Sequence, residues 1–140
     1  MTDWVFVDTS AFYALTDKGN LCHEEAAAFA RGLAESGTPL LTTSLVRAEA
    51  YGLVLLRLGR RKAQAFLAGL RLSATRVVHS SEADEKTAEA ILSQYDDQDF
   101  SYVDAVSFSV IKRLRIRRVF AFDTHFSLYR PPTGPLLVNR

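Results

Sequence analysis

The sequence contains very little cysteine and no long apolar run. Cys22 is the single cysteine among 140 residues, so the chain can form no internal disulfide and cannot build a thiolate zinc site. The longest uninterrupted aliphatic run, Leu53 to Leu56, is far too short to span a bilayer. The opening MTDWVFVD has an acid before its short apolar stretch and no basic lead, unlike a secretory signal. These absences predict a cytoplasmic protein without a membrane partner.

Two common binding patterns are also missing. The stretch DTSAF, and not a glycine-rich turn, follows the first apolar segment, which argues against a dinucleotide-binding domain. The histidines His23, His79 and His125 are scattered, and no two of them have the spacing of a helical zinc site. These two absences argue against a dinucleotide-binding domain and against a zinc site built from histidines.

The composition is that of a globular protein. Hydrophobic residues make up 48% and charged residues 24% of the chain, which is enough to bury a core and argues against a disordered tail. The length suits one domain over residues 1–140.

Basic residues are unevenly distributed although the net charge is only +1. One group lies at Arg57, Arg60, Arg61 and Lys62, and a second lies between Lys112 and Arg118. Such groups can neutralise phosphates. Alternatively, they are solvated helix ends, because cations are stabilised at helix C-termini.

Short apolar segments alternate with longer helical patterns along the chain. We expect strands at 4–7, 40–43, 76–79 and 118–122, with an edge strand at 136–138. Helices are expected at 10–16, 23–36, 44–58, 61–72, about 81–95, 101–115 and 125–129. This alternation predicts an α/β fold with a mostly parallel sheet that is covered by helices on both faces.

Two acids directly follow apolar strands. Asp8 comes after VFV and Asp123 comes after VFAF. Ligands of parallel sheets bind beyond the carboxyl ends of the strands, where both acids would lie at the same edge. Alternatively, either acid only caps the helix that follows it.

Two further acids lie on predicted helices. Glu49 falls within a stripe of apolar or small residues at helical spacing, formed by Leu45, Ala48, Gly52, Leu53 and Leu56. A glutamate there either serves a site or reaches water from a helix that is apolar nearly all round. Asp104 shares a helix face with Ser107, Phe108 and Ile111, and Ser101-x-x-Asp104 resembles a capping box. The cap and a role in a site are compatible.

We expect Asp8, Glu49, Asp104 and Asp123 to converge at one place. Two carboxylates ~4 Å apart repel by about 4 kcal/mol at an effective dielectric near 20, so a cation is needed or some of the acids are protonated. Oxygen ligands without zinc-like histidines favour Mg²⁺ or Mn²⁺, and such an ion suits phosphate chemistry.

These motifs resemble the PIN-domain family, and within it the VapC-type toxin ribonucleases of type II toxin–antitoxin systems. The matching stretches are VDTS at Asp8, LVRAEAYGL at Glu49, SYVDAVSFSV at Asp104 and FAFDTHF at Asp123. The resemblance implies a three-layer α/β/α sandwich with a mostly parallel four- to five-stranded sheet. It also implies metal-dependent endonucleolytic cleavage of RNA, a homodimer and inhibition by a cognate antitoxin.

The resemblance also implies roles for individual residues. Asp8 and Asp104 would be the main ligands of Mg²⁺ or Mn²⁺, and Glu49 and Asp123 would complete the catalytic pocket. Auxiliary pocket residues would be Thr9, Ser10, Asp99 and Ser101. The candidates for RNA contact are Arg47, Arg57, Arg60, Arg61 and Lys62.

The sequence departs from the family pattern in two places. Ala121 stands where many relatives have threonine, and His125 stands where a further acid often follows Asp123. Asp99 either compensates for that acid or belongs to a solvated acidic turn. The fourth ligand position is therefore open.

Two other functions remain alternatives. The first is a non-catalytic RNA-binding module on the same fold, because fold alone does not establish activity. The second is a phosphotransfer or phosphatase domain, which also places an Asp after the first strand. The usual phosphatase pattern has a second Asp two residues later, where this chain has Ser10.

Overall fold

A five-stranded parallel sheet forms the centre of the molecule. The computed structural model describes residue 1 and residues 3–140. The strands are β1 (Val5–Val7), β2 (Leu40–Thr43), β3 (Arg76–Val78), β4 (Arg118–Phe120) and β5 (Leu137–Val138). Their order is β3-β2-β1-β4-β5, and every pairing is parallel. The predicted parallel sheet is confirmed, with its last strand at the edge.

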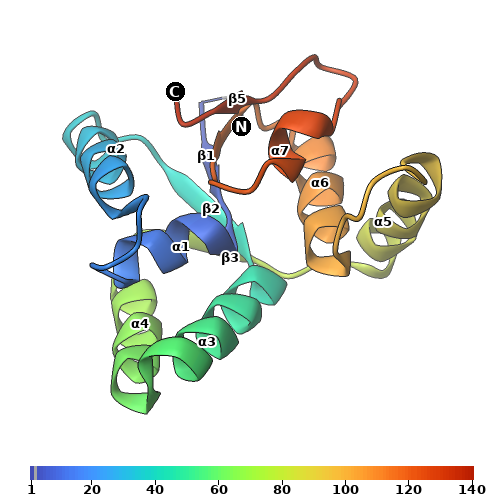
Figure 1. Cartoon of the computed structure of the whole chain (residues 1–140). Coiled ribbons are helices and arrows are strands. Elements are labelled where there is room, and N and C mark those ends of the chain that lie inside the picture. The colour runs from blue at the N-terminus through green and yellow to red at the C-terminus, as the bar shows by residue number, and fades with distance from the viewer. Residues whose placement is uncertain (2) are drawn as a thin grey trace.

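Helices connect the strands and cover the sheet (Figure 1). They are α1 (Thr9–Thr16), α2 (His23–Glu35), α3 (Ser44–Leu58), α4 (Arg60–Leu72), α5 (Glu82–Gln94), α6 (Tyr102–Leu114) and α7 (His125–Leu128). Each expected helix is present, with ends that differ by a residue or two because helix ends fray. No described helix has the length and apolarity needed to cross a membrane.

Strand β1 shows how one sheet faces two helical layers. Its residues are all buried, and successive side chains point to opposite faces of a strand. Phe6 packs in a cluster with α6 and α7 residues such as Phe108 and Phe126. Val5 and Val7 pack in another cluster with residues of α1 and α2. The continuous apolar run VFV therefore buries both faces of a central strand, and the predicted three-layer α/β/α sandwich is confirmed.

The carboxyl ends of the two central strands meet. Val7 and Phe120 are paired in the register of β1 and β4, and the Asp8 N–H donates to the Phe120 carbonyl oxygen at 3.0 Å. On the other side of β1, the buried Thr42 hydroxyl donates to the Val7 carbonyl oxygen at 2.7 Å. These contacts fix the backbone at the point where the first acid leaves the sheet.

The segment after β4 is held by a side chain from the end of the chain. Asn139 Oδ1 accepts a hydrogen bond from the Ala121 N–H at 2.9 Å, and Asn139 Nδ2 donates to the Ala121 carbonyl oxygen at 2.8 Å. The Asn139 amide thereby satisfies both backbone groups of the buried Ala121 where regular pairing with β5 stops. This contact lies two residues before Asp123.

Candidate active site

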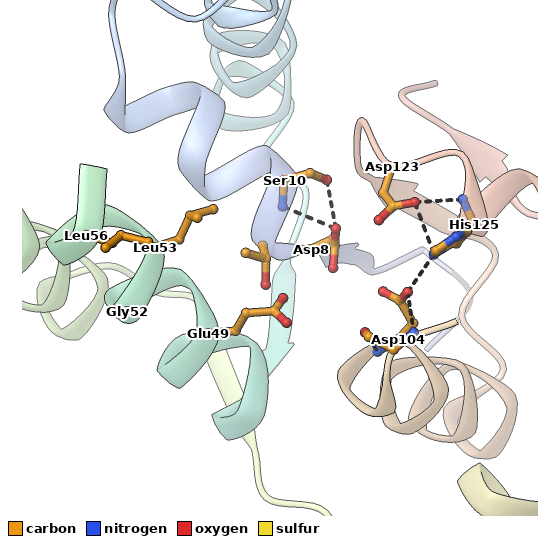
Figure 2. Close-up of a pocket in the computed structure, with 11 residues that line it drawn as sticks. Asp8, Ser10, Glu49, Gly52, Leu53, Leu56, Asp104, Asp123 and His125 are labelled. Atoms are coloured by element: carbon orange, nitrogen blue, oxygen red, sulfur yellow. Dashed lines mark hydrogen bonds and ion pairs between the residues drawn. The ribbon is translucent and has the colours of Figure 1, made fainter. Parts of the chain in front are cut away.

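A cavity of about 490 Å³ opens at the carboxyl ends of the central strands. It is lined by Asp8, Thr9, Ser10, Glu49, Gly52, Leu53, Leu56, Ser101, Asp104, Asp123 and His125. The four predicted acids therefore reach one cavity from four segments that are distant in the sequence. Figure 2 shows Glu49 on α3 facing Asp8, with Asp104, Asp123 and His125 on the opposite side.

Asp8 is the most deeply buried of these acids, at 3% exposure. It caps α1, because its Oδ2 accepts hydrogen bonds from the Ser10 N–H at 3.2 Å and from the Ser10 hydroxyl at 2.7 Å. Burial raises the pKa of Asp8 to about 6, and the charge of Asp104 contributes in the same direction. The hydrogen bonds from Ser10 act against this rise. Asp8 therefore caps α1 and also lines the cavity.

Ser10 connects two of the acidic segments. While its hydroxyl donates to Asp8, its Oγ accepts a hydrogen bond from the Phe122 N–H at 2.9 Å. The serine thus joins the start of α1 to the residue that precedes Asp123. Thr9 lines the same cavity, and its buried Oγ1 has no hydrogen-bond partner within the described part of the chain. An unpartnered buried hydroxyl is costly, which favours a bound ligand or water at that atom.

Asp104 is held at the first turn of α6 by the predicted capping box. Its Oδ2 accepts from the Ser101 N–H at 3.1 Å, and its own N–H donates to Ser101 Oγ at 3.0 Å. Asp104 is 5% exposed and lines the cavity together with Ser101. Capping therefore fixes the direction of a carboxylate that also faces the site.

His125 is the pocket residue that the sequence reasoning missed. Its Nδ1 lies 2.7 Å from Asp104 Oδ2 and 3.3 Å from Asp123 Oδ1, while its backbone N–H donates to Asp123 Oδ1 at 2.8 Å (Figure 2). The available signal was its place two residues after Asp123, where relatives often have an acid. Spacing between histidines could not reveal it, because its partners are carboxylates.

Glu49 reaches the cavity from a helix face that is not the core face. The buried residues of α3 are Val46, Ala50 and Val54, whereas Glu49 is exposed and Leu56 is 82% exposed. Of the stripe around Glu49, only Gly52, Leu53 and Leu56 line the cavity with it. Large apolar residues on several sides of α3 therefore do not reveal from the sequence which face packs inward.

Asp99 is not brought to the pocket. It is exposed, and it is absent from the residues that line the cavity. His125 lies beside Asp123 instead. A part for Asp99 in the site stays a prediction.

The predicted RNA-contact residues have different surroundings. Arg57 lies over the Tyr13 ring, with its guanidinium carbon 5.1 Å from the ring centroid. Arg47 lines a separate groove beside Arg71. Arg60, Arg61 and Lys62 are exposed in the first turn of α4. The helix dipole disfavours cations there, so the helix-end explanation suits Arg57 but not these three residues.

The second basic group lies away from the cavity. Lys112 and Arg113 are in the last turn of α6, and Asp104 is in its first turn. The helix length therefore separates that group from the cavity.

The donors of the cavity fit a divalent cation. Asp104, Asp123 and His125 each offer one ligand atom, and these atoms lie within 4.8 Å of one another. Asp8 adds a carboxylate whose pKa is raised by burial and, to a smaller extent, by the charge of Asp104. A cation would stabilise its charged form, and Thr9 Oγ1 provides a further oxygen at the cavity.

Comparison with known proteins identifies the family. The family model described as the PIN domain matches residues 5–130. The chain belongs to the PIN-domain family. This PIN domain is 36% identical over 124 residues to the 23S rRNA-specific endonuclease VapC20 of Mycobacterium tuberculosis, covering 88% of this chain and 92% of the relative. It is 30% identical over 131 residues to ribonuclease VapC26 of the same organism, covering 93% and 95%.

Solved structures agree with this assignment. The crystal structure of Mycobacterium tuberculosis VapC20, described as a toxin that cleaves the sarcin–ricin loop, superposes with a TM-score of 0.79. Its sequence is 34% identical, and the match covers 89% of this PIN domain and 93% of VapC20. VapBC2 from Rickettsia felis, bound to a promoter DNA fragment, gives a TM-score of 0.70 with 96% of each chain covered. At 15% identity, this second match supports the fold alone. The predicted family and its VapC-type relatives are confirmed.

Proposed function

We propose that this PIN domain is a metal-dependent endoribonuclease and the toxin of a toxin–antitoxin pair. The observation that carries the proposal is the convergence of Asp8, Glu49, Asp104 and Asp123 on one cavity. The homology to VapC20 and VapC26, two proteins named as RNA-cleaving enzymes, supports the same activity.

The metal site would be formed by Asp8, Asp104 and Asp123, with Glu49 completing it from α3. When bound, Mg²⁺ or Mn²⁺ would supply Lewis acidity toward a phosphate oxygen and lower the pKa of water. The protein's part is to hold the carboxylates in place. The Ser101 cap orients Asp104, and Ser10 orients Asp8 relative to the segment of Asp123.

The other residues of the cavity would orient water and RNA. A carboxylate that is not engaged in binding the ion can accept a hydrogen bond from the attacking water and direct its lone pair at the phosphorus. Leu53 and Leu56 offer an apolar wall for an unstacked base. Arg60, Arg61 and Lys62 would attract the phosphate backbone. As the family resemblance implies, cleavage would leave a 5′-phosphate and a 3′-hydroxyl.

The substrate proposal follows the relatives. VapC20 is named as specific for 23S rRNA and its crystal structure as that of a sarcin–ricin loop cleaving toxin. We therefore propose ribosomal RNA as the first substrate class to test. Purified ribosomes, transfer RNA and a messenger transcript, each mapped by primer extension, would separate these choices.

The partners and location also remain proposals. We expect a cytoplasmic homodimer that is inhibited by an antitoxin. Light scattering after size-exclusion chromatography would give the mass of the pure protein. Co-expression with the product of the adjacent gene would show whether growth arrest is relieved.

Cleavage of RNA by the pure protein tests the central proposal. The parent should cut RNA with Mg²⁺ or Mn²⁺ and stop when a chelator is added, and Asp8→Asn should be inactive. Circular dichroism would establish that the variant is folded. Equal cleavage by parent and variant would contradict the proposal. Metal-independent RNA binding without turnover would instead identify a binding module, and a mass increase after incubation with acetyl phosphate would identify a phosphotransfer domain.

A further inference from the structure

His125 brings an imidazole nitrogen into a pocket that otherwise offers oxygen ligands. Its Nδ1 faces Asp104 and Asp123 together, and the three ligand atoms form one compact group. We propose that His125 is a direct ligand of the divalent cation and makes the pocket prefer Mn²⁺ to Mg²⁺. This inference rests on the proposed function, because it concerns the same cation.

The spacing of the atoms supports shared coordination. Nδ1 of His125 is 2.7 Å from Asp104 Oδ2 and 3.3 Å from Asp123 Oδ1. Adjacent ligands of an octahedral ion lie about 3 Å apart when each is roughly 2.1 Å from the metal. The nitrogen therefore already lies at ligand spacing from both carboxylates. Without an ion, this spacing is that of a hydrogen bond from Nδ1–H to Asp104 Oδ2. When the proton moves to Nε2, the Nδ1 lone pair becomes available to a cation held between the same groups.

The imidazole is also held in place. The backbone N–H of His125 donates to Asp123 Oδ1 at 2.8 Å, which ties the ring's own residue to one of its partners. The ring packs edge-to-face on Phe100, with centroids 5.1 Å apart, and Phe100 is only 8% exposed. Preorganisation of this kind lowers the cost of binding an ion, since the ligand does not have to be ordered first.

The chemistry of the nitrogen determines which ion benefits. Mg²⁺ prefers oxygen ligands and retains water in place of softer donors. First-row transition metals accept imidazole readily, and Mn²⁺ is the member of that series that also suits carboxylates. An oxygen-only pocket with an acid at position 125 would discriminate less between the two ions. His125 would therefore set ion preference and leave the remaining acids to bind either ion.

Metal binding by the full chain tests this assignment without RNA. The parent, His125→Asn and His125→Asp would be stripped of metal and titrated with Mn²⁺, alone and in competition with Mg²⁺. Asn places an amide nitrogen near the former Nδ1, where it can donate to Asp104 as Nδ1–H does but has no lone pair for a metal, while Asp supplies an oxygen ligand. His79→Asn is the matched control, because His79 is exposed and outside the cavity.

We expect the preference for Mn²⁺ over Mg²⁺ to fall by about tenfold or more in both His125 variants, which corresponds to about 1.4 kcal/mol. It should not change in His79→Asn. Pulsed electron paramagnetic resonance of the Mn²⁺-loaded parent should show coupling to an imidazole ¹⁴N. That signal should persist in His79→Asn and vanish in both His125 variants. If His125→Asp does not fold, His125→Asn carries the test.

The outcomes separate this inference from the proposed function. A bound Mn²⁺ without ¹⁴N coupling, or an unchanged ion preference in folded His125 variants, overturns the role of His125 even if the parent cleaves RNA. Coupling that depends on His125 in a protein that does not cleave RNA supports the ligand and overturns the nuclease. A parent that binds neither ion overturns both.

Discussion

Asp84 and Asp104 are buried acids at the same position of two adjacent helices. Each is the third residue of its helix and forms a capping box with a serine three residues earlier. The Ser81 N–H donates to Asp84 Oδ2 at 3.0 Å, and the Ser101 N–H donates to Asp104 Oδ2 at 3.1 Å. Their exposed fractions are 3% and 5%. The two acids therefore have the same sequence motif, the same capping hydrogen bonds and nearly the same burial.

The two acids differ in what faces them. Arg113 binds Asp84 through Nε at 2.7 Å and Nη2 at 2.9 Å, and this contact holds the pKa of Asp84 below its usual value. Asp104 instead faces His125 and a cavity that contains Asp8. A capping box thus positions a carboxylate, and the neighbouring elements decide whether that carboxylate is paired with a cation or left facing the cavity. The ion pair of Asp84 with Arg113 joins α5 to α6. The Asp104 carboxylate lines the cavity instead.

The largest expected effect comes from neutralising each acid in turn. Asp104→Asn should lower RNA cleavage by about a thousandfold, because loss of a metal ligand removes several kcal/mol of transition-state stabilisation. Asp84→Asn should retain activity and lose about 2 kcal/mol of unfolding free energy, since half-exposed Arg113 is partly compensated by water. Cleavage rates and urea unfolding of both variants would measure this. Equal activity losses would show that the two sites are not distinct.

The pH dependence of stability should have opposite signs for the two kinds of acid. Asp8 has a folded pKa of about 6, above its ordinary 3.8, so the metal-free native state binds the proton more tightly than the unfolded chain. Its ionisation therefore costs stability as pH rises through this range, by up to about 3 kcal/mol at pH 8. The lowered pKa of Asp84 gives a contribution that is present above pH 3.8 and is lost as the pH falls below it.

Asp8→Asn sharpens this contrast. With a chelator present, we expect the variant to be more stable than the parent at pH 8, and the advantage should be about half as large at pH 5. Asn retains an acceptor for Ser10, so the cap is preserved. Urea unfolding at both pH values would measure the difference, with Asp84→Asn as the comparison. A variant that is less stable than the parent at pH 8 would contradict the burial of an uncompensated charge.

Ser10 donates a hydrogen bond to Asp8, as Arg113 does to Asp84, but its hydroxyl is neutral. Ser10→Ala removes the hydrogen bond to Asp8 and leaves the Phe122 N–H without its partner. We expect a loss of about 1.5 kcal/mol in stability and about tenfold in cleavage, because two ligand segments lose their link. Ser10→Thr keeps the hydroxyl and should lose less of both. If alanine and threonine behave identically, the hydroxyl is not the positioning group.

The smallest effect should come from the two caps themselves. Ser81→Ala and Ser101→Ala should each lower stability by about 1 kcal/mol, because each removes one acceptor from a helix N-terminus. Only Ser101→Ala should also weaken Mn²⁺ binding, by a few-fold, because Asp104 loses part of its orientation. Isothermal titration with Mn²⁺ would distinguish them. Equal Mn²⁺ affinities would show that the cap does not orient the ligand.

The sequence predicted the strands and the convergence of the acids because both follow from local rules. An all-apolar strand such as VFV is covered on both faces, and the carboxyl ends of parallel strands meet at one edge. Asp8 and Asp123 then had to lie near each other, as Figure 2 shows. Their roles in catalysis stay predictions until the variants are tested.

The sequence could not predict contacts that depend on how elements pack. The bounds of α3 were predicted, but its inward face was not, because leucines occur on several sides of the helix while the small Ala50 and Val54 form the packed face. His125 enters the pocket through the turn after β4, and its place two residues after Asp123 was the only signal, because the direction of its ring depends on how that turn packs. Asp99, although close to Asp104 in sequence, lies in an exposed loop before the cap.

Asn139 shows that a residue can govern the pocket without lining it. Its side-chain amide makes the two hydrogen bonds to Ala121 that a neighbouring strand would make. The backbone continues from Ala121 to Asp123 and His125. A chain that ends before Asn139 would leave the Ala121 N–H and carbonyl oxygen without their hydrogen-bond partners. The turn that carries Asp123 and His125 would then lose the contact that holds its start. Removal of Asn139 would therefore disturb the positions of Asp123 and His125 although neither residue is changed.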